Sequence, residues 1–68
     1  MTEVYIKTEF INLDQLLKLI GLTQTGGQAK KLILDGKVKV NNTIELKRGK
    51  KVRKEDIVEV DGKIYVVK

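Results

Sequence analysis

Residues 25–42, TGGQAKKLILDGKVKVNN, contain in order the signals for a helix start, a helix stop, a strand and a turn. Thr25 followed three residues later by Gln28 is the capping-box pattern, in which two side chains satisfy backbone N–H groups that lack partners at a helix start. Apolar residues then recur at i, i+3 and i+4, which predicts a helix with one buried face, formed by Ala29, Leu32 and Ile33. The lysines of this helix are expected on its exposed side.

The second half of the segment predicts a strand and a hairpin. Gly36 can adopt the left-handed conformation that ends helices, because it has no Cβ. Valine and lysine then alternate, as in a half-buried strand, which we place at Val38–Val40. Asn41 and Asn42 adopt positive φ more readily than most residues, so Thr43–Leu46 is predicted to return as the partner strand.

The predicted helix start also has features of a phosphate-binding site. Gly26 and Gly27 leave its first turn without side chains, so an anion can approach N–H groups at the positive end of the helix dipole. Lys30 and Lys31 follow within one turn. Neither G-x-x-x-x-G-K-[ST] nor G-x-G-x-x-G is present, which excludes the common nucleotide-binding loops. The glycine pair therefore has two interpretations: helix-start geometry alone, or a backbone contact to phosphate.

Further elements are predicted before this segment. Asn12 is placed to cap a helix, and apolar residues at i, i+3, i+4 and i+7, followed by Gly21, predict that helix over residues 13–20. The short connection Leu22–Gln24 then makes the two helices a packed pair. Val4–Ile6 is rich in β-forming residues, which predicts an edge or terminal strand.

A second hairpin is predicted near the C-terminus. Ile57–Val60 and Lys63–Val67 flank Asp61-Gly62, which is a strong two-residue turn signal. We therefore expect an α+β fold in which two packed helices lie against a small, mostly antiparallel sheet of four or five strands. The chain, residues 1–68, is expected to form a single domain because it is too short for two hydrophobic cores.

Composition excludes several classes of protein. The chain has no cysteine and no histidine, which excludes disulfides and the common zinc sites. No apolar run approaches the roughly 20 residues of a membrane span, and the N-terminal segment lacks the apolar centre of a secretory signal. We expect a soluble, cytoplasmic monomer with no cofactor, no metal, no membrane association and no small-molecule substrate.

Positive charge is concentrated in one part of the chain. Residues 30–54 contain ten basic and two acidic residues, a net charge of +8, whereas the rest of the chain carries −3 and the whole chain +5. Six of the eight residues in Lys47–Lys54 are basic and Gly49 predicts a bend, so we expect a charged loop there. Concentrated positive charge attracts polyanions, most commonly nucleic acid. An acidic membrane surface, or a lysine-rich face that binds nothing in particular, is the alternative.

Few residues are suited to catalysis or to base stacking. Turn formation and solubility explain the acidic pair Glu55-Asp56 and the nearby Glu59 better than acid–base catalysis does, so we expect no enzyme activity. All aromatic residues lie outside the basic segment and are predicted to be core residues, namely Tyr5, Phe10 and Tyr65. Recognition of phosphates and shape is therefore favoured over stacking of bases on exposed rings.

The order of these motifs resembles a known family. LDQLLKLIGL at residues 13–22, the segment at 25–42, a basic turn and EDIVEV at 55–60 together resemble the S-four RNA-binding domain, named from a small-subunit ribosomal protein. The likeness spans about residues 11–60. Its most specific positions are Leu13-Asp14 with Leu17, Gly21-Leu22, Ala29 with Leu32-Ile33, Gly36, Val38 and Val40-Asn41. The glycine pair and ELKRGKKVRKEDIVEV at 45–60 are similar to the small stand-alone bacterial members of the YaaA type.

The resemblance implies the alpha-L RNA-binding motif, with RNA bound by the second helix and the following hairpin and without catalysis or cofactor. The positions that it implies for RNA binding are Gly26, Gly27, Lys30, Lys31, Lys37, Lys39, Asn41 and Asn42, extended by Lys47, Arg48, Lys50, Lys51 and Arg53 of the basic loop. Three positions differ from many members. Asn12 replaces an arginine, Gly26-Gly27 replaces Ser-Arg, and Asn42 replaces a glycine, so the basic loop is expected to compensate for two missing cationic contacts.

We therefore interpret the chain as a non-catalytic module that binds structured RNA, with ribosomal RNA as the favoured class. The alternative is a protein-interaction module whose basic face docks an acidic partner in a ribonucleoprotein assembly. DNA binding is disfavoured because neither predicted helix is long or basic enough to be an obvious reader of the major groove. The identity of the RNA, the cellular process and the sharing of the basic surface with a protein stay open at this point.

Overall fold

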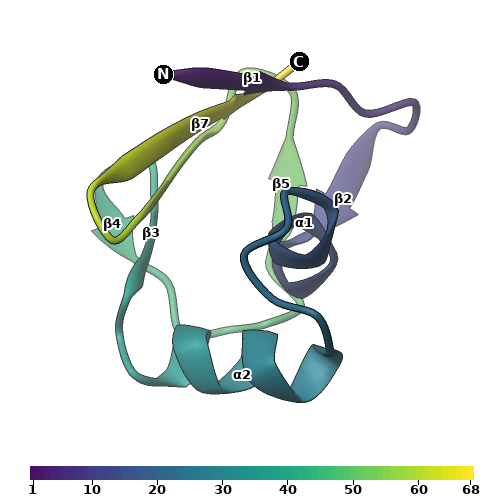
Figure 1. The fold of residues 1–68 in the computed structure, drawn as a ribbon. Coiled ribbons are helices and arrows are strands. Elements are labelled where there is room, and N and C mark those ends of the chain that lie inside the picture. Colours follow the sequence, from purple (N-terminus) through teal and green to yellow (C-terminus); the bar gives the residue numbers. More distant parts are fainter.

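The computed structural model describes residues 1–68 and contains two helices and two sheets (Figure 1). The elements in chain order are β1 (Thr2–Val4), β2 (Phe10–Asn12), α1 (Leu13–Leu19), α2 (Gly26–Leu34), β3 (Val38–Val40), β4 (Thr43–Ile44), β5 (Lys51–Arg53), β6 (Ile57–Val60) and β7 (Lys63–Val67). Five strands form one sheet in the order β1-β7-β6-β3-β4, in which only the β1–β7 pair is parallel. β2 and β5 form a separate antiparallel ribbon. The predicted α+β architecture is confirmed.

One hydrophobic core joins the helices to both sheets. The residues that face inward from α1 and α2 have no exposed surface, and they are Leu13, Leu16, Leu17, Ala29 and Ile33. They pack in one cluster with fully buried valines from four strands, Val38, Val52, Val58 and Val67. Burying one such aliphatic side chain stabilises the fold by roughly 1.5–3 kcal/mol, so this cluster supplies most of the driving force in a chain without disulfides.

The chain reversals occur where the turn residues predicted them. Gly21 and Gly36 have φ of +80° and +74°, and they end α1 and α2 in the left-handed conformation that a Cβ disfavours. Asn41-Asn42 and Asp61-Gly62 also have positive φ throughout, and they connect β3 to β4 and β6 to β7. The β3–β4 hairpin is shorter than predicted, because β4 ends at Ile44 rather than at Leu46.

The first strand lies two residues earlier than predicted. It was expected at Val4–Ile6 but occupies Thr2–Val4, where Val4 is buried and pairs with Val67 of β7. The pairing with β7 decides this register, and no local pattern contains it. Tyr5 then leaves the sheet and is 71% exposed, so its predicted place in the core is wrong, whereas Tyr65 is buried as expected.

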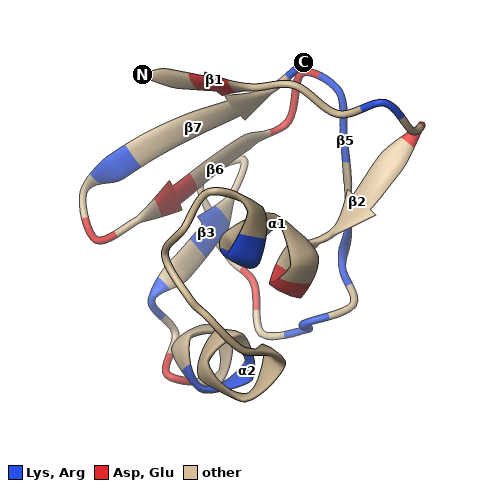
Figure 2. Cartoon of the chain, turned by 45° about the vertical axis from the view of Figure 1, so that its right-hand side comes forward, with Lys and Arg blue, Asp and Glu red and all other residues tan.

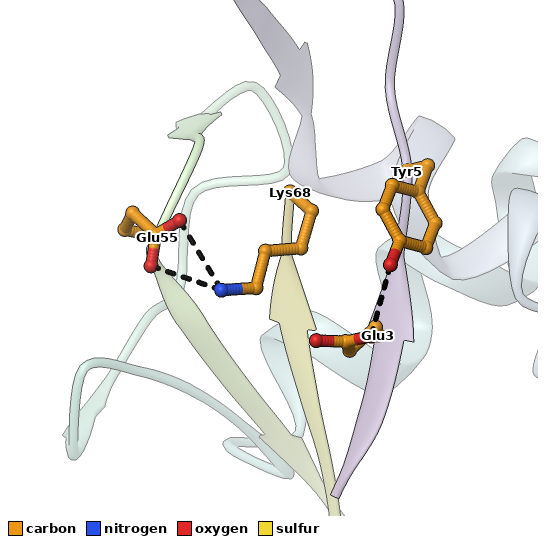
Figure 3. Close-up of polar contacts among 4 residues, drawn as sticks. All are labelled: Glu3, Tyr5, Glu55 and Lys68. Carbon is orange, nitrogen blue, oxygen red and sulfur yellow. Dashed lines mark hydrogen bonds and ion pairs between the residues drawn. The ribbon is translucent and has the colours of Figure 1, made fainter.

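Tyr5 instead makes a local contact near the ends of the chain (Figure 3). Its hydroxyl donates a hydrogen bond of 2.9 Å to Glu3, and Lys68 lies nearby in an ion pair with Glu55 at 3.3 Å. The pKa of Tyr5 is raised because Glu3 accepts the phenol proton in that hydrogen bond and its negative charge opposes the phenolate.

Two strands were not predicted. Residues 47–54 were expected to form a loop, but Lys51–Arg53 is strand β5, and it pairs with β2 immediately before α1. Val52 lies opposite Ile11 across this ribbon, and its fully buried side chain anchors the ribbon to the core. One apolar residue between two cations is too short a pattern to predict a strand, and its partner lies some forty residues away. Neither α1 nor α2 has the length and the apolar composition that a membrane-spanning helix requires.

Candidate nucleic-acid interface

The start of α2 is held in place by side-chain caps. Thr25 Oγ1 accepts a hydrogen bond of 3.2 Å from the backbone N–H of Gln28, as the capping-box pattern predicted. Gln28 Oε1 accepts from the backbone N–H of Gln24 at 2.8 Å, one residue earlier than that pattern implies. Both bonds fix the direction in which the first N–H groups of α2 point.

Gly26 and Gly27 leave the start of α2 open. Their N–H groups precede the first intrahelical hydrogen bond. A Cβ at Gly26 would meet no atom within 4 Å, and a Cβ at Gly27 would meet only Thr25 Oγ1 at 3.9 Å. Neither glycine has a positive φ. Packing and backbone conformation therefore do not require glycine at either position, and neither residue has a side chain that could shield its own N–H group.

The lysines of α2 are exposed on the side away from the core. Lys30 has no carboxylate within ion-pair distance, whereas Lys31 lies 3.5 Å from Asp35 one turn later. The side chains of that pair are 80% and 44% exposed, so water screens the pair and it contributes little stability. Both lysines remain available to an anion.

The basic loop is tied to the start of α1 by its backbone. The carbonyl oxygens of Lys50 and Arg48 accept hydrogen bonds of 2.9 and 3.0 Å from the backbone N–H groups of Leu13 and Asp14. Asn12 occupies the cap position as predicted, but its side chain makes no capping bond. The loop carbonyls thus take the role expected of Asn12. Because its backbone is held against α1, the loop directs cationic side chains to the solvent, and Lys47, Arg48 and Lys50 are all exposed.

The ribbon continues this cationic surface. Lys51 and Arg53 flank the buried Val52, so both lie on the outer side of β5 together with Phe10 of β2. Lys51 Nζ lies 5.0 Å and Arg53 Cζ lies 5.6 Å from the centre of the Phe10 ring. Phe10 was predicted to be a core residue, but it is only partly buried and lies among the cations. Its place depends on pairing between distant strands, and no local signal in the sequence marks it.

The remaining predicted positions follow α2 in the chain. Lys37 is exposed just after α2 and borders, with Lys31, a hollow of about 380 Å³ beside the helix. Lys39 lies on the face of the five-stranded sheet that is turned away from the helices, directly opposite Glu59. Its charge therefore lies on a different surface from that of α2, next to a carboxylate.

Asn41 and Asn42 lie at the end of β3 that is remote from α2. The Asn41 amide donates to Asp56 Oδ1 at 3.1 Å, and its Oδ1 accepts from the backbone N–H of Ile57 at 2.9 Å. Asp56 also accepts from the backbone N–H of Arg53 at 2.8 Å. The Asn41 side chain thus holds the turn to β6, and through Asp56 to the end of β5.

The cations of the predicted surface are largely uncompensated. Of the ten basic residues in 30–54, only Lys31 has a carboxylate within 4 Å. In Figure 2, blue (Lys and Arg) predominates over red (Asp and Glu) on α2, on the segment that leads to β5 and on β5 itself, with short red stretches at the end of α2 and before that segment, whereas the sheet shows both signs of charge. We call the surface formed by α2, the loop 47–50 and the outer side of β5 the basic surface. No group of three or more carboxylates converges anywhere in the structure.

Comparisons with known proteins agree with this architecture. The chain is 41% identical over 59 residues, 87% of its length, to the Bacillus subtilis (strain 168) protein named "Probable ribosome maturation protein RlbA", of which 83% is covered. It is similar to the solution structure of YbcJ from E. coli, described as containing an alfaL motif involved in RNA binding, with a TM-score of 0.73 and 32% identity over 98% of this chain and 86% of YbcJ.

A more distant similarity concerns the fold alone. The 30S ribosomal protein S4e from Thermoplasma acidophilum matches 88% of this chain with a TM-score of 0.66 and 22% identity, over 32% of its own length.

The family model described as S4 domain matches residues 4–68. That match covers both helices, both sheets except the start of β1, and the whole basic surface, and the chain therefore belongs to the S4 domain family.

Proposed function

We propose that this protein is a non-catalytic RNA-binding module that holds structured RNA, in particular ribosomal RNA, through phosphate contacts and shape. The observation that carries the proposal is the basic surface, on which every cation except Lys31 has no carboxylate within 4 Å. Uncompensated cations on a rigid frame release the counterions of a polyanion when they bind it, which supplies affinity that does not depend on base sequence. The module is the single domain of residues 1–68, acting as a monomer.

The direct contacts come from the basic surface. The backbone N–H groups of Gly26 and Gly27 bind a phosphate. Cations of α2, of the segment that follows it, of the loop 47–50 and of β5 neutralise further phosphates, namely Lys30, Lys31, Lys37, Lys47, Arg48, Lys50, Lys51 and Arg53. Lys39 and Asn42 make secondary contacts from the sheet side. Asn41 acts by fixing the β3–β4 turn, since both ends of its amide are already bonded within the protein.

The similar proteins support this choice of ligand. RlbA is named for a probable role in ribosome maturation, and the motif of YbcJ is described as involved in RNA binding. Both matches extend over most of the chain, including α2 and the basic loop. We therefore assign ribosomal RNA or its precursors as the ligand class and the cytoplasm as the place of action.

The competing function is docking of an acidic protein within a ribonucleoprotein assembly. The same cations would serve it, but the open helix start of α2 favours phosphate, because two adjacent free N–H groups suit its oxygens. Nuclease treatment separates the two functions. A partner that stays bound after complete RNA digestion would indicate protein docking.

The direct test is ultraviolet crosslinking of the protein to RNA in cells, followed by sequencing of the bound fragments. We expect enrichment of a small number of structured ribosomal RNA segments over messenger RNA. A variant in which Lys30, Lys31, Arg48 and Lys51 are replaced by Gln serves as the control and is expected to lose the enrichment. Equal, unenriched recovery of all RNA classes by both proteins would contradict the proposal.

A further inference from the structure

The outer side of the β2–β5 ribbon contains an aromatic ring that the core does not need. Ile11 and Val52 occupy the inner side of the ribbon and pack on the core, and Val52 is fully buried. Phe10 lies on the opposite side, directly across from Arg53. An aromatic residue in that position contributes little to the core, yet it is the only ring among the cations of the basic surface.

Two cations lie over this ring without fixed partners of their own. Lys51 Nζ is 5.0 Å and Arg53 Cζ is 5.6 Å from the ring centre, distances at which a cation is attracted to the π-face. Neither residue has a carboxylate within 4 Å. Both side chains are long and exposed, so each can rotate from the ring to a phosphate while the ring face becomes free.

The backbone beneath the ring is well fixed. Thr8 Oγ1 donates a hydrogen bond of 2.7 Å to the carbonyl oxygen of Phe10, and Asp56 accepts from the N–H of Arg53 at 2.8 Å. A polar hollow of about 440 Å³ adjoins the ribbon, lined by Lys7, Thr8, Glu9, Arg53 and Lys54. A ring on a rigid strand beside a polar hollow can hold a flat ligand with little loss of entropy.

We propose that Phe10, with Lys51 and Arg53, forms a binding site for one unpaired RNA base. The ring stacks on the base, and the two cations neutralise the phosphates on either side of that nucleotide. The proposal rests on the RNA-binding function above and adds to it a preference for RNA with an extruded base. A paired base cannot use the site, because both of its faces are already stacked within the duplex.

The test uses three hairpin RNAs that differ at one position. The first has a single bulged adenosine, the second is fully paired, and the third has an abasic residue at the bulge. We expect the native protein to bind the first most tightly. Phe10→Leu keeps an apolar side chain but has no π-face, so it should lose about 5- to 150-fold in affinity for the bulged RNA, the loss that corresponds to 1–3 kcal/mol of stacking per base. Its affinity for the other two RNAs should stay the same.

A spectroscopic variant tests the site without relying on Phe10→Leu. The chain has no tryptophan, so Phe10→Trp introduces a single tryptophan at the site, which can be excited selectively at wavelengths that Tyr5 and Tyr65 do not absorb. Its emission should be quenched by the bulged hairpin and far less by the abasic one. Tyr5→Leu is the matched control, since it removes an exposed ring outside the ribbon and should leave all three affinities unchanged.

The outcomes separate the base site from the general function. If Phe10→Leu and the native protein bind all three hairpins equally, or if Phe10→Trp is quenched equally by bulged and abasic RNA, the base site is wrong while RNA binding stands. If the native protein binds none of the hairpins and no ribosomal RNA, the RNA-binding function itself is wrong.

Discussion

The basic surface and the outer face of the five-stranded sheet are both exposed, but they differ in charge and in polarity. On the basic surface, only Lys31 has a carboxylate within 4 Å, that of Asp35. On the sheet, Lys39 faces Glu59, and the neighbouring side chains are the exposed isoleucines Ile44, Ile57 and Ile64. Lys39 belongs to the basic part of the sequence but not to the basic surface, because strand alternation turns it away. Charge counted along the chain is therefore an incomplete guide to charge in space.

The largest effect on RNA affinity is expected from removing positive charge on the basic surface. Replacing Lys30, Lys31, Arg48 and Lys51 by Gln should lower affinity for ribosomal RNA by roughly 100- to 1,000-fold near physiological salt, and lower the salt slope by about three to four units, because each phosphate contact releases counterions. Filter binding or fluorescence anisotropy over a salt series measures both quantities.

The control for this experiment removes the same formal charge elsewhere. Replacing Lys7, Lys18, Lys63 and Lys68 by Gln takes four lysines that lie outside the basic segment. Its effect should be small where the Debye length is about 8 Å, since only long-range attraction is lost. Equal losses of RNA affinity from the two sets of substitutions at that salt concentration would show that binding is not localised to the basic surface.

A substitution in the core should destabilise the whole domain, because the helices and the sheet share that core. Leu17 is fully buried in α1, between the helices and the sheet. Leu17→Ala should lower the free energy of unfolding by about 2–5 kcal/mol, because a cavity replaces lost contacts, and a domain this small has little stability to spare. Denaturant unfolding followed by circular dichroism measures the change. A decrease in the free energy of unfolding well under 1 kcal/mol would mean that Leu17 does not lie in a core shared by the helices and the sheet.

A single substitution tests the helix start within the basic surface. Gly27→Val places branching beside the free N–H groups of α2, while its Cβ would meet only Thr25 Oγ1 at 3.9 Å. The fold should stay intact, and affinity for ribosomal RNA should fall by roughly 5- to 10-fold through the lost phosphate contact. Leu34→Val, at the exposed far end of the same helix, is the matched control. Unchanged binding by a folded Gly27→Val would exclude the phosphate contact.

A buried hydroxyl next to α2 offers a change in stability without a change in charge. Thr23 is buried and its Oγ1 has no hydrogen-bond partner. Thr23→Val keeps the shape and removes the unsatisfied group, so the free energy of unfolding should rise by about 1 kcal/mol. RNA affinity should be the same as in the native protein. Destabilisation would show that the hydroxyl has a partner in solution, such as a water molecule.

The smallest effect is expected at Tyr5, the exposed residue that directly follows β1. Its raised pKa means that the hydrogen bond to Glu3 stabilises the fold below pH 10 and is lost as pH rises through the pKa of the folded state. Glu3→Gln should lower the Tyr5 pKa towards its ordinary value, which ¹³C NMR titration of the ring measures. Binding of RNA should not change. An unchanged pKa would show that the contact with Glu3 does not form.

Both helices and most turns followed from local patterns. Capping at Thr25, the apolar faces of the helices, and the glycine and asparagine turns depend on interactions within a few residues, so the sequence alone predicted them. The concentration of positive charge around α2 was likewise visible in the sequence. Its use as an RNA surface stays a prediction that the experiments above address.

Contacts between distant segments were decided only by the tertiary structure. The register of β1 depends on β7, the existence of β5 depends on β2, and the start of α1 is capped by carbonyls of Arg48 and Lys50 rather than by Asn12. The pairing of β2 with β5 also brings Phe10 among the cations. Local propensity is a sum over neighbouring residues, whereas these features arise when the whole chain closes around one core, so no short window of sequence contains them.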